Sequence, residues 1–220
     1  MTEKTGLIIT GGRLDLAFAG SFLEKNRFQC VVSVDGGLKY TEKLGLTPSA
    51  VVGDFDTVDP LLLQRYRDIP GILWDVHKPE KDETDTELAI NTAMKLGCTH
   101  LTLLGATGGR LDHEWSNLHL LKLCLDHGVN ACLLDSQNKV YLLSEGKTFC
   151  QSKVYGTYIS FLPLTEQVHG ITLKGFKYPL NKKDIRMGAE AGLCVSNEIV
   201  EEKAVITFDD GILICVESKD

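Results

Sequence analysis

Residues 7–134 alternate short apolar runs with segments of helical periodicity, and this alternation constrains the fold more than any other feature. Glycines follow most of the apolar runs and end most of the helical segments. Strands that alternate with helices of about 10–15 residues form βαβ units, which build a mostly parallel sheet with helices on both faces. We therefore predict a Rossmann-like α/β domain with strands at 7–10, 30–34, 50–52, 72–76, 100–104 and 130–134 and helices at 14–23, 38–45, 86–96 and 111–127.

After about residue 140 the pattern changes to short β-rich segments separated by Gly, Pro or Asn-Glu turns. No helical period of useful length occurs there, which favours a small antiparallel sandwich or barrel. The predicted strands are 147–150, 155–162, 168–173, 193–196, 199–203, 204–208 and 212–217. We place the α/β domain at 1–143 and an all-β domain at 144–220.

Composition excludes some partners and leaves others open. The chain has 220 residues, of which 43% are apolar, so it is long enough to bury a substantial core. Its net charge of −7 argues against non-specific nucleic-acid binding, which needs a basic face. An anionic substrate stays possible, because a bound metal ion can supply the positive charge.

The cysteines and the hydropathy pattern predict a soluble cytoplasmic protein. Seven cysteines are an odd number, contain no Cys-x-x-Cys pair, and lie mostly in apolar runs, which is typical of a reducing compartment. The sequence has no signal-peptide pattern and no apolar run of about 18 residues or more. We expect no membrane partner.

Val51–Thr57 reads as a buried strand, a glycine and two carboxylates, Asp54 and Asp56. Residues two apart in an extended chain point to the same side, so these two carboxylates can face one ligand. Like charges this close repel each other unless a cation lies between them, and Mg²⁺ favours such carboxylates together with phosphate oxygens. The alternative is an acidic turn with solvated side chains.

Further polar residues follow the other strands. Ligands of open α/β sheets bind at the carboxyl ends of the strands, where these loops meet. Carboxylates that converge from different loops repel one another, so the cluster favours a metal with a polyphosphate over a structural role. The candidates are Asp35, Asp54, Asp56, Asp82, Asp85, Arg110 and Asp112.

The pentapeptide Gly-Gly-Arg-Leu-Asp occurs twice, at 11–15 and at 108–112, each time at a strand-to-helix turn. The repeat has two equally good explanations. The first is chance, together with the need for glycine in strand-to-helix turns. The functional interpretation is a pair of helix N-termini aimed at phosphate oxygens, each with an arginine nearby. His113 follows the second copy, which makes that copy the better candidate.

Five segments occur in the order and spacing of bacterial thiamin pyrophosphokinases, and the chain resembles that family from residue 6 to about 215. Each motif is weak alone, but together they span both predicted domains. They are Asp35-Gly36-Gly37; Gly53-Asp-Phe-Asp-Thr57; Lys81-Asp-Glu-Thr-Asp85; Gly108-Gly-Arg-Leu-Asp-His113; and a C-terminal set of Gly175–Leu180, Gly188, Gly192 and Ser196-Asn-Glu198.

The resemblance implies transfer of a pyrophosphoryl group from ATP to the hydroxyethyl oxygen of thiamine, giving thiamine diphosphate and AMP with Mg²⁺ as cofactor. It implies metal ligands at Asp54, Asp56 and Asp85, with Asp35 beside them as a further catalytic carboxylate. It implies that Lys81 and Arg110 contact the phosphates and that Asp112 and His113 shape the nucleotide site. A purely structural role for His113 is equally compatible with the sequence. The matched ATP-binding segments also contain Gly36, Gly37, Asp82 and Thr84.

The same resemblance implies an α/β nucleotide domain followed by a β-sandwich, in a homodimer with the active site at the subunit interface. Tyr178 would stack on thiamine, and Ser196 and Asn197 would bond its pyrimidine. Without the resemblance, Tyr178 would read as an ordinary strand aromatic.

Two other functions compete with this interpretation. Asp54-Phe-Asp56-Thr57-Val58 also resembles the motif of haloacid-dehalogenase-like phosphatases, in which the first aspartate is a phosphorylated nucleophile. That motif normally lies on the first strand, whereas two strand–helix units precede it here. A nucleotide-sensing module without catalysis is the third possibility.

Overall fold

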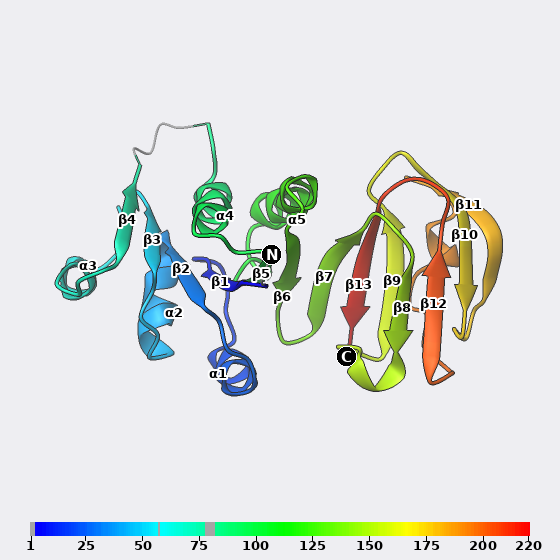
Figure 1. Cartoon of the computed structure of the whole chain (residues 1–220), viewed down its shortest axis with the longest axis horizontal. Coiled ribbons are helices and arrows are strands. Elements are labelled where there is room, and N and C mark those ends of the chain that lie inside the picture. The colour runs from blue at the N-terminus through cyan, green and yellow to red at the C-terminus, as the bar shows by residue number, and fades with distance from the viewer. Residues whose placement is uncertain (1–2, 57, 78–81) are drawn as a thin grey trace. The chain divides into compact units, whose positions relative to one another are not determined.

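The computed structural model describes residues 3–56, 58–77 and 82–220, and the chain divides into two units between Ser136 and Gln137 (Figure 1). The division lies before the predicted boundary at 143/144. The reason is strand β7 (Asn138–Leu143), which pairs antiparallel with β13 (Leu213–Ser218) and so belongs to the second unit.

The first unit is built on six strands in the order β4-β3-β2-β1-β5-β6, and every pair in it is parallel. The prediction of a mostly parallel α/β fold is confirmed. The elements are β1 (Thr5–Ile9), α1 (Leu16–Lys25), β2 (Cys30–Val34), η1 (Asp35–Gly37), α2 (Leu38–Lys43), β3 (Ala50–Gly53), α3 (Pro60–Arg67), β4 (Leu73–Val76), α4 (Asp85–Lys95), β5 (His100–Leu104), α5 (Leu111–Asp126) and β6 (Asn130–Leu134).

Burial follows from the position of each strand in the sheet. β1 lies in the centre, and Leu7, Ile8 and Ile9 have no exposed surface because helices cover both faces. Helices α4 and α5 lie on one face and α1 and α2 on the other (Figure 1). β4 is an edge strand, and Leu73 and Val76 are exposed there. No helix in the described ranges is both long and apolar enough to cross a membrane.

The strand order creates a switch point between β1 and β5. From β1 the chain builds outward through β2, β3 and β4, and then returns to add β5 and β6 on the other side of β1. The loops after β1 and β5 therefore leave in opposite directions. Such a crevice, at the carboxyl ends of the strands, is where open α/β sheets bind ligands.

Helix α3 was not among the predicted helices. Asp59 caps it by accepting a hydrogen bond from the Leu61 N–H at 2.9 Å, and Pro60 occupies its first turn. Leu62 and Tyr66 are buried in a cluster that also contains Phe55. The helix is short, so its apolar stripe holds too few residues to give a clear period.

The second unit holds two antiparallel sheets, one with the order β7-β13-β9 and one with the order β11-β10-β12-β8. Phe161 from the first sheet and Phe149 from the second lie 6.0 Å apart between ring centroids, and both contact Phe176. This aromatic core between two sheets confirms the predicted sandwich. The elements beyond β7 are β8 (Lys147–Cys150), η2 (Gln151–Lys153), β9 (Tyr158–Pro163), β10 (Gln167–Lys174), β11 (Leu180–Arg186), η3 (Ala191–Leu193), β12 (Lys203–Thr207) and β13.

Two strand predictions in this unit were wrong, and two of its strands, β7 and β11, were not predicted. Segment 193–196 is not a strand, because a 3₁₀ turn ends at Leu193 and Ser196 has a left-handed φ of 53°. In segment 199–203 only Lys203 lies in a strand, as the first residue of β12. β11 was missed because it is a polar edge strand in which only Ile185 is fully buried, so it lacks the apolar alternation that marks a half-buried strand.

Candidate active site

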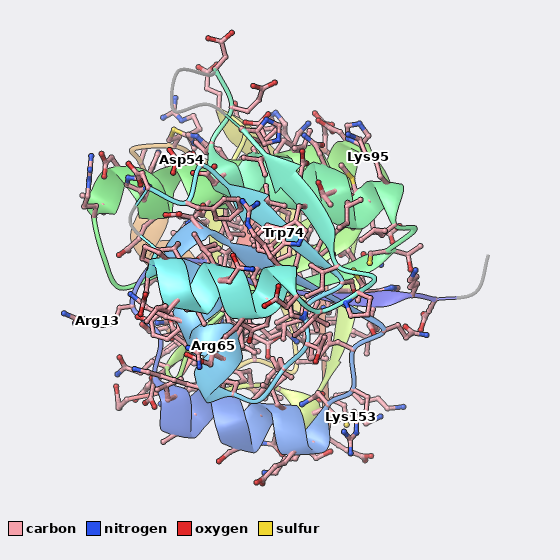
Figure 2. The ribbon with its side chains drawn as sticks, turned by 90° about the vertical axis from the view of Figure 1, so that its left-hand side faces the viewer. Arg13, Asp54, Arg65, Trp74, Lys95 and Lys153 are labelled. Atoms are coloured by element: carbon pink, nitrogen blue, oxygen red, sulfur yellow. The ribbon has the colours of Figure 1, made fainter. Side chains whose placement is uncertain are left out.

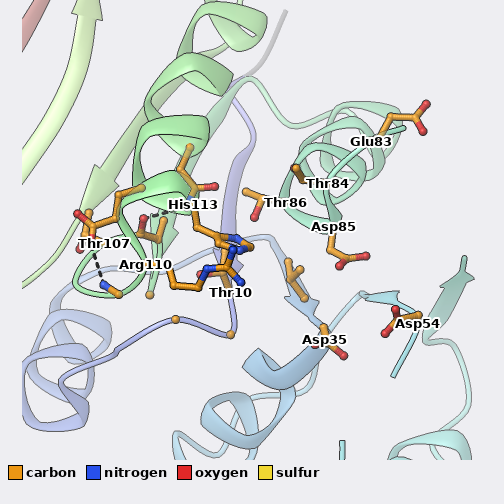
Figure 3. A pocket seen from close by; sticks show the side chains of 18 residues that line it. Thr10, Asp35, Asp54, Glu83, Thr84, Asp85, Thr86, Thr107, Arg110 and His113 are labelled. Carbon is orange, nitrogen blue, oxygen red and sulfur yellow. Dashed lines mark hydrogen bonds between the residues drawn. The ribbon is translucent and has the colours of Figure 1, made fainter. Parts of the chain in front are cut away.

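A cavity of about 540 Å³ opens at the carboxyl ends of the parallel strands, over the switch point between β1 and β5 (Figure 3). Its walls come from the loops after β1, β2, β3 and β5 and from the N-terminal turns of α4 and α5. These segments come from five consecutive βα units, with the loop after β5 and the start of α5 in the same unit. The parallel topology brings them together, because it places all these loops at one edge of the sheet.

Three carboxylates gather on one side of this cavity. One oxygen each of Asp35, Asp54 and Asp56 lies within 4.8 Å of the others. Asp35 and Asp54 line the cavity, and Figure 3 shows them on the wall opposite Arg110. Oxygen donors in such an arrangement fit a hard divalent cation such as Mg²⁺, which relieves their mutual repulsion.

Asp54 and Asp56 come together through a turn, not through the extended chain that the sequence predicted. Phe55 between them has a left-handed φ of 63°. Its side chain is buried and packs edge-to-face with Trp74, with 5.5 Å between the ring centroids. The Asp54 carboxylate accepts a hydrogen bond from the Asp56 N–H at 3.3 Å. Burial of Phe55 therefore holds the turn and leaves both carboxylates outside the core.

Asp35 also has a left-handed backbone, with φ of 42° directly after β2. Gly53 lies against it, and a Cβ at Gly53 would come within 3.1 Å of the Asp35 Cβ. Left-handed backbone in a non-glycine residue costs free energy and is concentrated at functional sites. Five such residues occur in the described chain, and Asp35, Phe55 and Ser196 all belong to predicted site segments.

The first turn of α4 forms another wall. Thr84 caps the helix by accepting from the Glu87 N–H at 3.2 Å, and Asp85 is the first helical residue. Asp85 lines the cavity but is not in the three-carboxylate cluster, so its role as a metal ligand stays a prediction. Asp82 is exposed and does not line the cavity, whereas Glu83 does. Lys81 and Thr57 lie outside the described residues.

Arg110 and His113, at the start of α5, line the wall that faces the carboxylates (Figure 3). The Arg110 guanidinium donates two hydrogen bonds to Asp112, at 3.1 and 2.6 Å. Both partners are exposed, and the pairing lowers the pKa of the Asp112 carboxyl and raises that of Arg110. Asp112 therefore orients Arg110 from outside the cavity lining.

Gly36 and Gly37 do not line the cavity. A Cβ at Gly37 would come within 2.2 Å of the Ile9 carbonyl oxygen, so this position requires glycine for close packing of η1 on β1. Their predicted contact with ATP stays a prediction.

Several cavity residues were not predicted as site residues. Asn117 is buried on α5 and donates to the Ala106 carbonyl at 2.8 Å, and Glu114 accepts from the Gly109 N–H at 2.6 Å. Asn117 lies four residues after His113, so helical spacing from that histidine was a signal that could have found it. Thr10 and Thr107 line the cavity from the loops after β1 and β5.

The predicted thiamine residues cluster in the second unit. Tyr178 exposes 55% of its surface, and Asn197 next to it exposes 1%. The Asn197 carboxamide bonds both backbone groups of Tyr178, at 3.0 and 2.8 Å. Ser196 is exposed, and its N–H donates to the Ser160 hydroxyl at 2.9 Å.

Two family descriptions match the chain. Residues 23–133 match the catalytic domain of thiamin pyrophosphokinase, and residues 147–213 match its vitamin B1 binding domain. The chain belongs to the thiamin pyrophosphokinase family. Its membership makes it an enzyme, and the predicted class of thiamine diphosphokinase is confirmed.

Similar proteins and solved structures support this assignment. Thiamine pyrophosphokinase of Bacillus subtilis (strain 168) is 34% identical over 189 residues, which cover 86% of this chain and 87% of that protein. A crystal structure of thiamine pyrophosphokinase from Bacillus subtilis has a TM-score of 0.86 at 30% identity and covers 99% of this chain and 100% of that one. Thiamin pyrophosphokinase from Candida albicans, at 16% identity, has the same fold, with a TM-score of 0.81 over 98% of this chain and 89% of that one.

The thiamin pyrophosphokinase family forms thiamine diphosphate from thiamine, which makes the chain a transferase of the kinase type. Neither competing function, phosphatase or nucleotide sensor, has support from these relatives. Asp54 also follows the third strand of the chain, not the first, where the phosphatase motif would place its nucleophile.

Proposed function

We propose that the chain transfers a pyrophosphoryl group from ATP to the hydroxyethyl oxygen of thiamine, giving thiamine diphosphate and AMP in a Mg²⁺-dependent reaction. The observation that carries this proposal is the cavity in which Asp35 and Asp54, two members of the three-carboxylate cluster, lie opposite Arg110. Acidic residues alone would repel a polyphosphate. A cation site combined with a guanidinium group can bind a polyphosphate.

The reaction requires the thiamine oxygen to attack the β-phosphorus of ATP in line with the departing AMP. Catalysis of such a step is mostly positioning and neutralisation of charge. Asp54 and Asp56, together with Asp35 or Asp85, would hold Mg²⁺, which supplies charge neutralisation on the phosphate oxygens when bound. The attacking oxygen belongs to the substrate, so none of these carboxylates acts as a covalent nucleophile.

The α5 wall would bind the phosphates. Arg110 has N–H groups that its bonds to Asp112 do not use, and these can donate to phosphate oxygens while Asp112 holds the guanidinium plane. His113 shapes the nucleotide site beside it. Lys81, Asp82 and Thr84, with Gly36 and Gly37, complete the ATP-binding set.

Thiamine is a cation with an aromatic pyrimidine and would use the face of Tyr178, with Ser196 and Asn197 beside it. We propose that the chain forms a homodimer in which Tyr178 of one protomer serves the ATP site of its partner. We place the enzyme in the cytoplasm, which agrees with seven cysteines that form no disulfide in the described chain.

Incubation with Mg-ATP and thiamine tests the reaction directly. We expect AMP and thiamine diphosphate in equal amounts, measured by ion-pair chromatography, with no ADP. ADP with thiamine monophosphate would mean transfer of a single phosphoryl group. ATP binding without any AMP would refute the enzyme proposal.

Asp56→Asn removes one charge of the carboxylate cluster on an exposed turn, so the fold should persist while turnover falls on the order of 100-fold. Turnover at several Mg²⁺ concentrations measures the effect. Asp126→Asn is the matched control, since Asp126 is an exposed aspartate that pairs with Lys122 on α5. Near-normal turnover of Asp56→Asn at low Mg²⁺ would contradict the metal assignment.

Mixing two inactive variants tests the shared site. Tyr178→Ala protomers exchanged with Asp54→Asn protomers should regain part of the activity, because some sites in the mixed dimer combine an intact Tyr178 with an intact Asp54. Inactivity despite subunit exchange confirmed by mass spectrometry would place each site within one protomer.

A further inference from the structure

Asn197 has a buried side chain directly beneath the exposed Tyr178. The Tyr178 N–H donates to Asn197 Oδ1 at 3.0 Å, and Asn197 Nδ2 donates to the Tyr178 carbonyl at 2.8 Å. Oδ1 also accepts from the Glu198 N–H at 3.0 Å. Both lone-pair positions of Oδ1 are thereby used by the backbone, so this oxygen is not available to a ligand.

The side chain of Asn197 continues a ladder that the backbone begins. Phe176 pairs with Ile199, and the Lys177 N–H donates to the Glu198 carbonyl at 2.8 Å. The backbone of residue 197 cannot continue this pairing, because it exchanges two hydrogen bonds with Ile159 of β9, at 2.7 and 3.0 Å. The carboxamide, which has the donor and acceptor of a peptide group, takes its place opposite Tyr178.

Tyr178 would otherwise be weakly held. More than half of its surface is exposed, so packing contributes little to fixing the residue. An aromatic platform that is ordered before the ligand arrives avoids the conformational entropy cost of ordering it on binding. The segment on its N-terminal side is anchored, since Phe176 is buried in the aromatic core of the sandwich.

We propose that Asn197 is a positioning residue, which fixes the backbone of Tyr178 and thereby presents its ring to thiamine. The consequence for thiamine rests on the proposed function, whereas the positioning itself does not. Asn197 acts through Tyr178, which differs from the direct bond to the pyrimidine that the family resemblance implies.

The chemistry of the carboxamide makes the inference specific. Asn197→Asp keeps an acceptor for the Tyr178 N–H but loses the donor to the Tyr178 carbonyl and buries a carboxylate beside that oxygen. Asn197→Ala removes both bonds and leaves buried backbone groups without partners. We expect the backbone of Tyr178 to become more mobile in both variants, and more so in Asn197→Ala than in Asn197→Asp.

Amide hydrogen exchange resolved to residues 176–180 measures the positioning without any assay of activity. The Tyr178 amide should exchange at least about tenfold faster in Asn197→Ala, which loses its acceptor, and by a smaller factor in Asn197→Asp, while β9 and β12 keep wild-type protection. Gln151→Ala is the matched control, because Gln151 Nε2 donates at 2.9 Å to the carbonyl of Ile199, a residue of the same segment that pairs with Phe176 and not with Tyr178. That control should keep the Tyr178 amide protected.

Steady-state kinetics then tests the consequence. The KM for thiamine should rise about tenfold in Asn197→Asp, with the KM for Mg-ATP unchanged. Unchanged exchange at Tyr178 in both variants would overturn the positioning role, and so would equal rises in the two KM values. Faster exchange at Tyr178 in a protein whose wild type forms no AMP would leave the positioning intact and refute the proposed function instead.

Discussion

The two Gly-Gly-Arg-Leu-Asp segments of the first unit have identical residues but different structures. In the first copy the whole pentapeptide precedes α1, and Asp15 caps that helix by accepting from the N–H groups of Ala17 and Phe18. In the second copy α5 already begins at Leu111, so Asp112 lies inside its first turn and pairs with Arg110. The same five residues therefore supply a helix cap in one place and an arginine that lines the cavity in the other.

The residues that follow each copy explain the shift. Glu114 reaches back to accept from the Gly109 N–H and stabilises an earlier helix start, whereas the corresponding residue after the first copy is Ala17. Asn117 similarly fixes the Ala106 carbonyl, where the first copy has Gly20. Local sequence beyond the repeat thus decides its register, and identical motifs do not predict identical function.

The two loops also pack on each other, so each glycine has its own constraint. A Cβ at Gly12 would lie 2.2 Å from the Gly105 carbonyl oxygen, whereas a Cβ at Gly109, the same position of the other copy, would meet nothing within 4 Å. Gly108 needs its left-handed φ of 73°. Arg13 points away from the body of the unit and does not line the cavity, in contrast to Arg110 (Figure 2).

The largest expected difference between the copies is at their second glycine. Gly12→Ala should lower the free energy of unfolding by about 3 kcal/mol, because backbone atoms must move to admit the methyl group. Gly109→Ala should change it by less than about 0.5 kcal/mol. Urea denaturation followed by circular dichroism measures both, and equal losses would show that the loops do not differ in packing.

The arginines should differ in activity. Arg110→Ala is expected to lower kcat/KM for Mg-ATP about 100-fold, since it removes a donor that faces the cavity. Arg13→Ala should stay within about twofold, because its side chain is exposed outside the cavity lining. Similar losses in the two variants would mean that both copies bind phosphate, as the repeat in the sequence had suggested.

The smallest expected difference is between Asp15 and Asp112, the last residues of the two copies, and it concerns the stability of the fold. Asp15→Ala removes the cap of α1 and should cost about 1 kcal/mol of unfolding free energy. Asp112→Ala removes an exposed ion pair and an exposed hydrogen bond from the adjacent His113 N–H, so it should leave the thermal midpoint nearly unchanged. Differential scanning calorimetry of the two variants measures this, and a larger loss in Asp112→Ala would reverse the assignment of cap and pair.

Sequence periodicity predicted the first unit well and the second unit less well. The strands at 30–34, 100–104 and 130–134 have the predicted bounds, because buried parallel strands are continuous apolar runs. β11 has exposed lysines and was missed, and the segment 193–196 was taken for a strand although Ser196 has a left-handed φ. Edge strands and irregular loops depend on neighbours that a local pattern does not contain.

The site was predicted in its residue types more than in its geometry. Asp35, Asp54, Asp85, Arg110 and His113 do line one cavity, since all follow strands whose carboxyl ends share an edge. Asn117 and Glu114 were missed because their roles depend on the particular backbone groups that they bond.

The sequence by itself determined the βαβ alternation, the sandwich that follows and the family, because these depend on the order of apolar runs and on motifs at fixed spacing. Only the tertiary structure decided that Phe55 turns Asp54 and Asp56 toward Asp35, that the two pentapeptides differ in register, and that Asn197 holds Tyr178. The physical reason is that each depends on burial or on a hydrogen bond between residues brought together by folding. Such contacts leave no periodic signal along the chain.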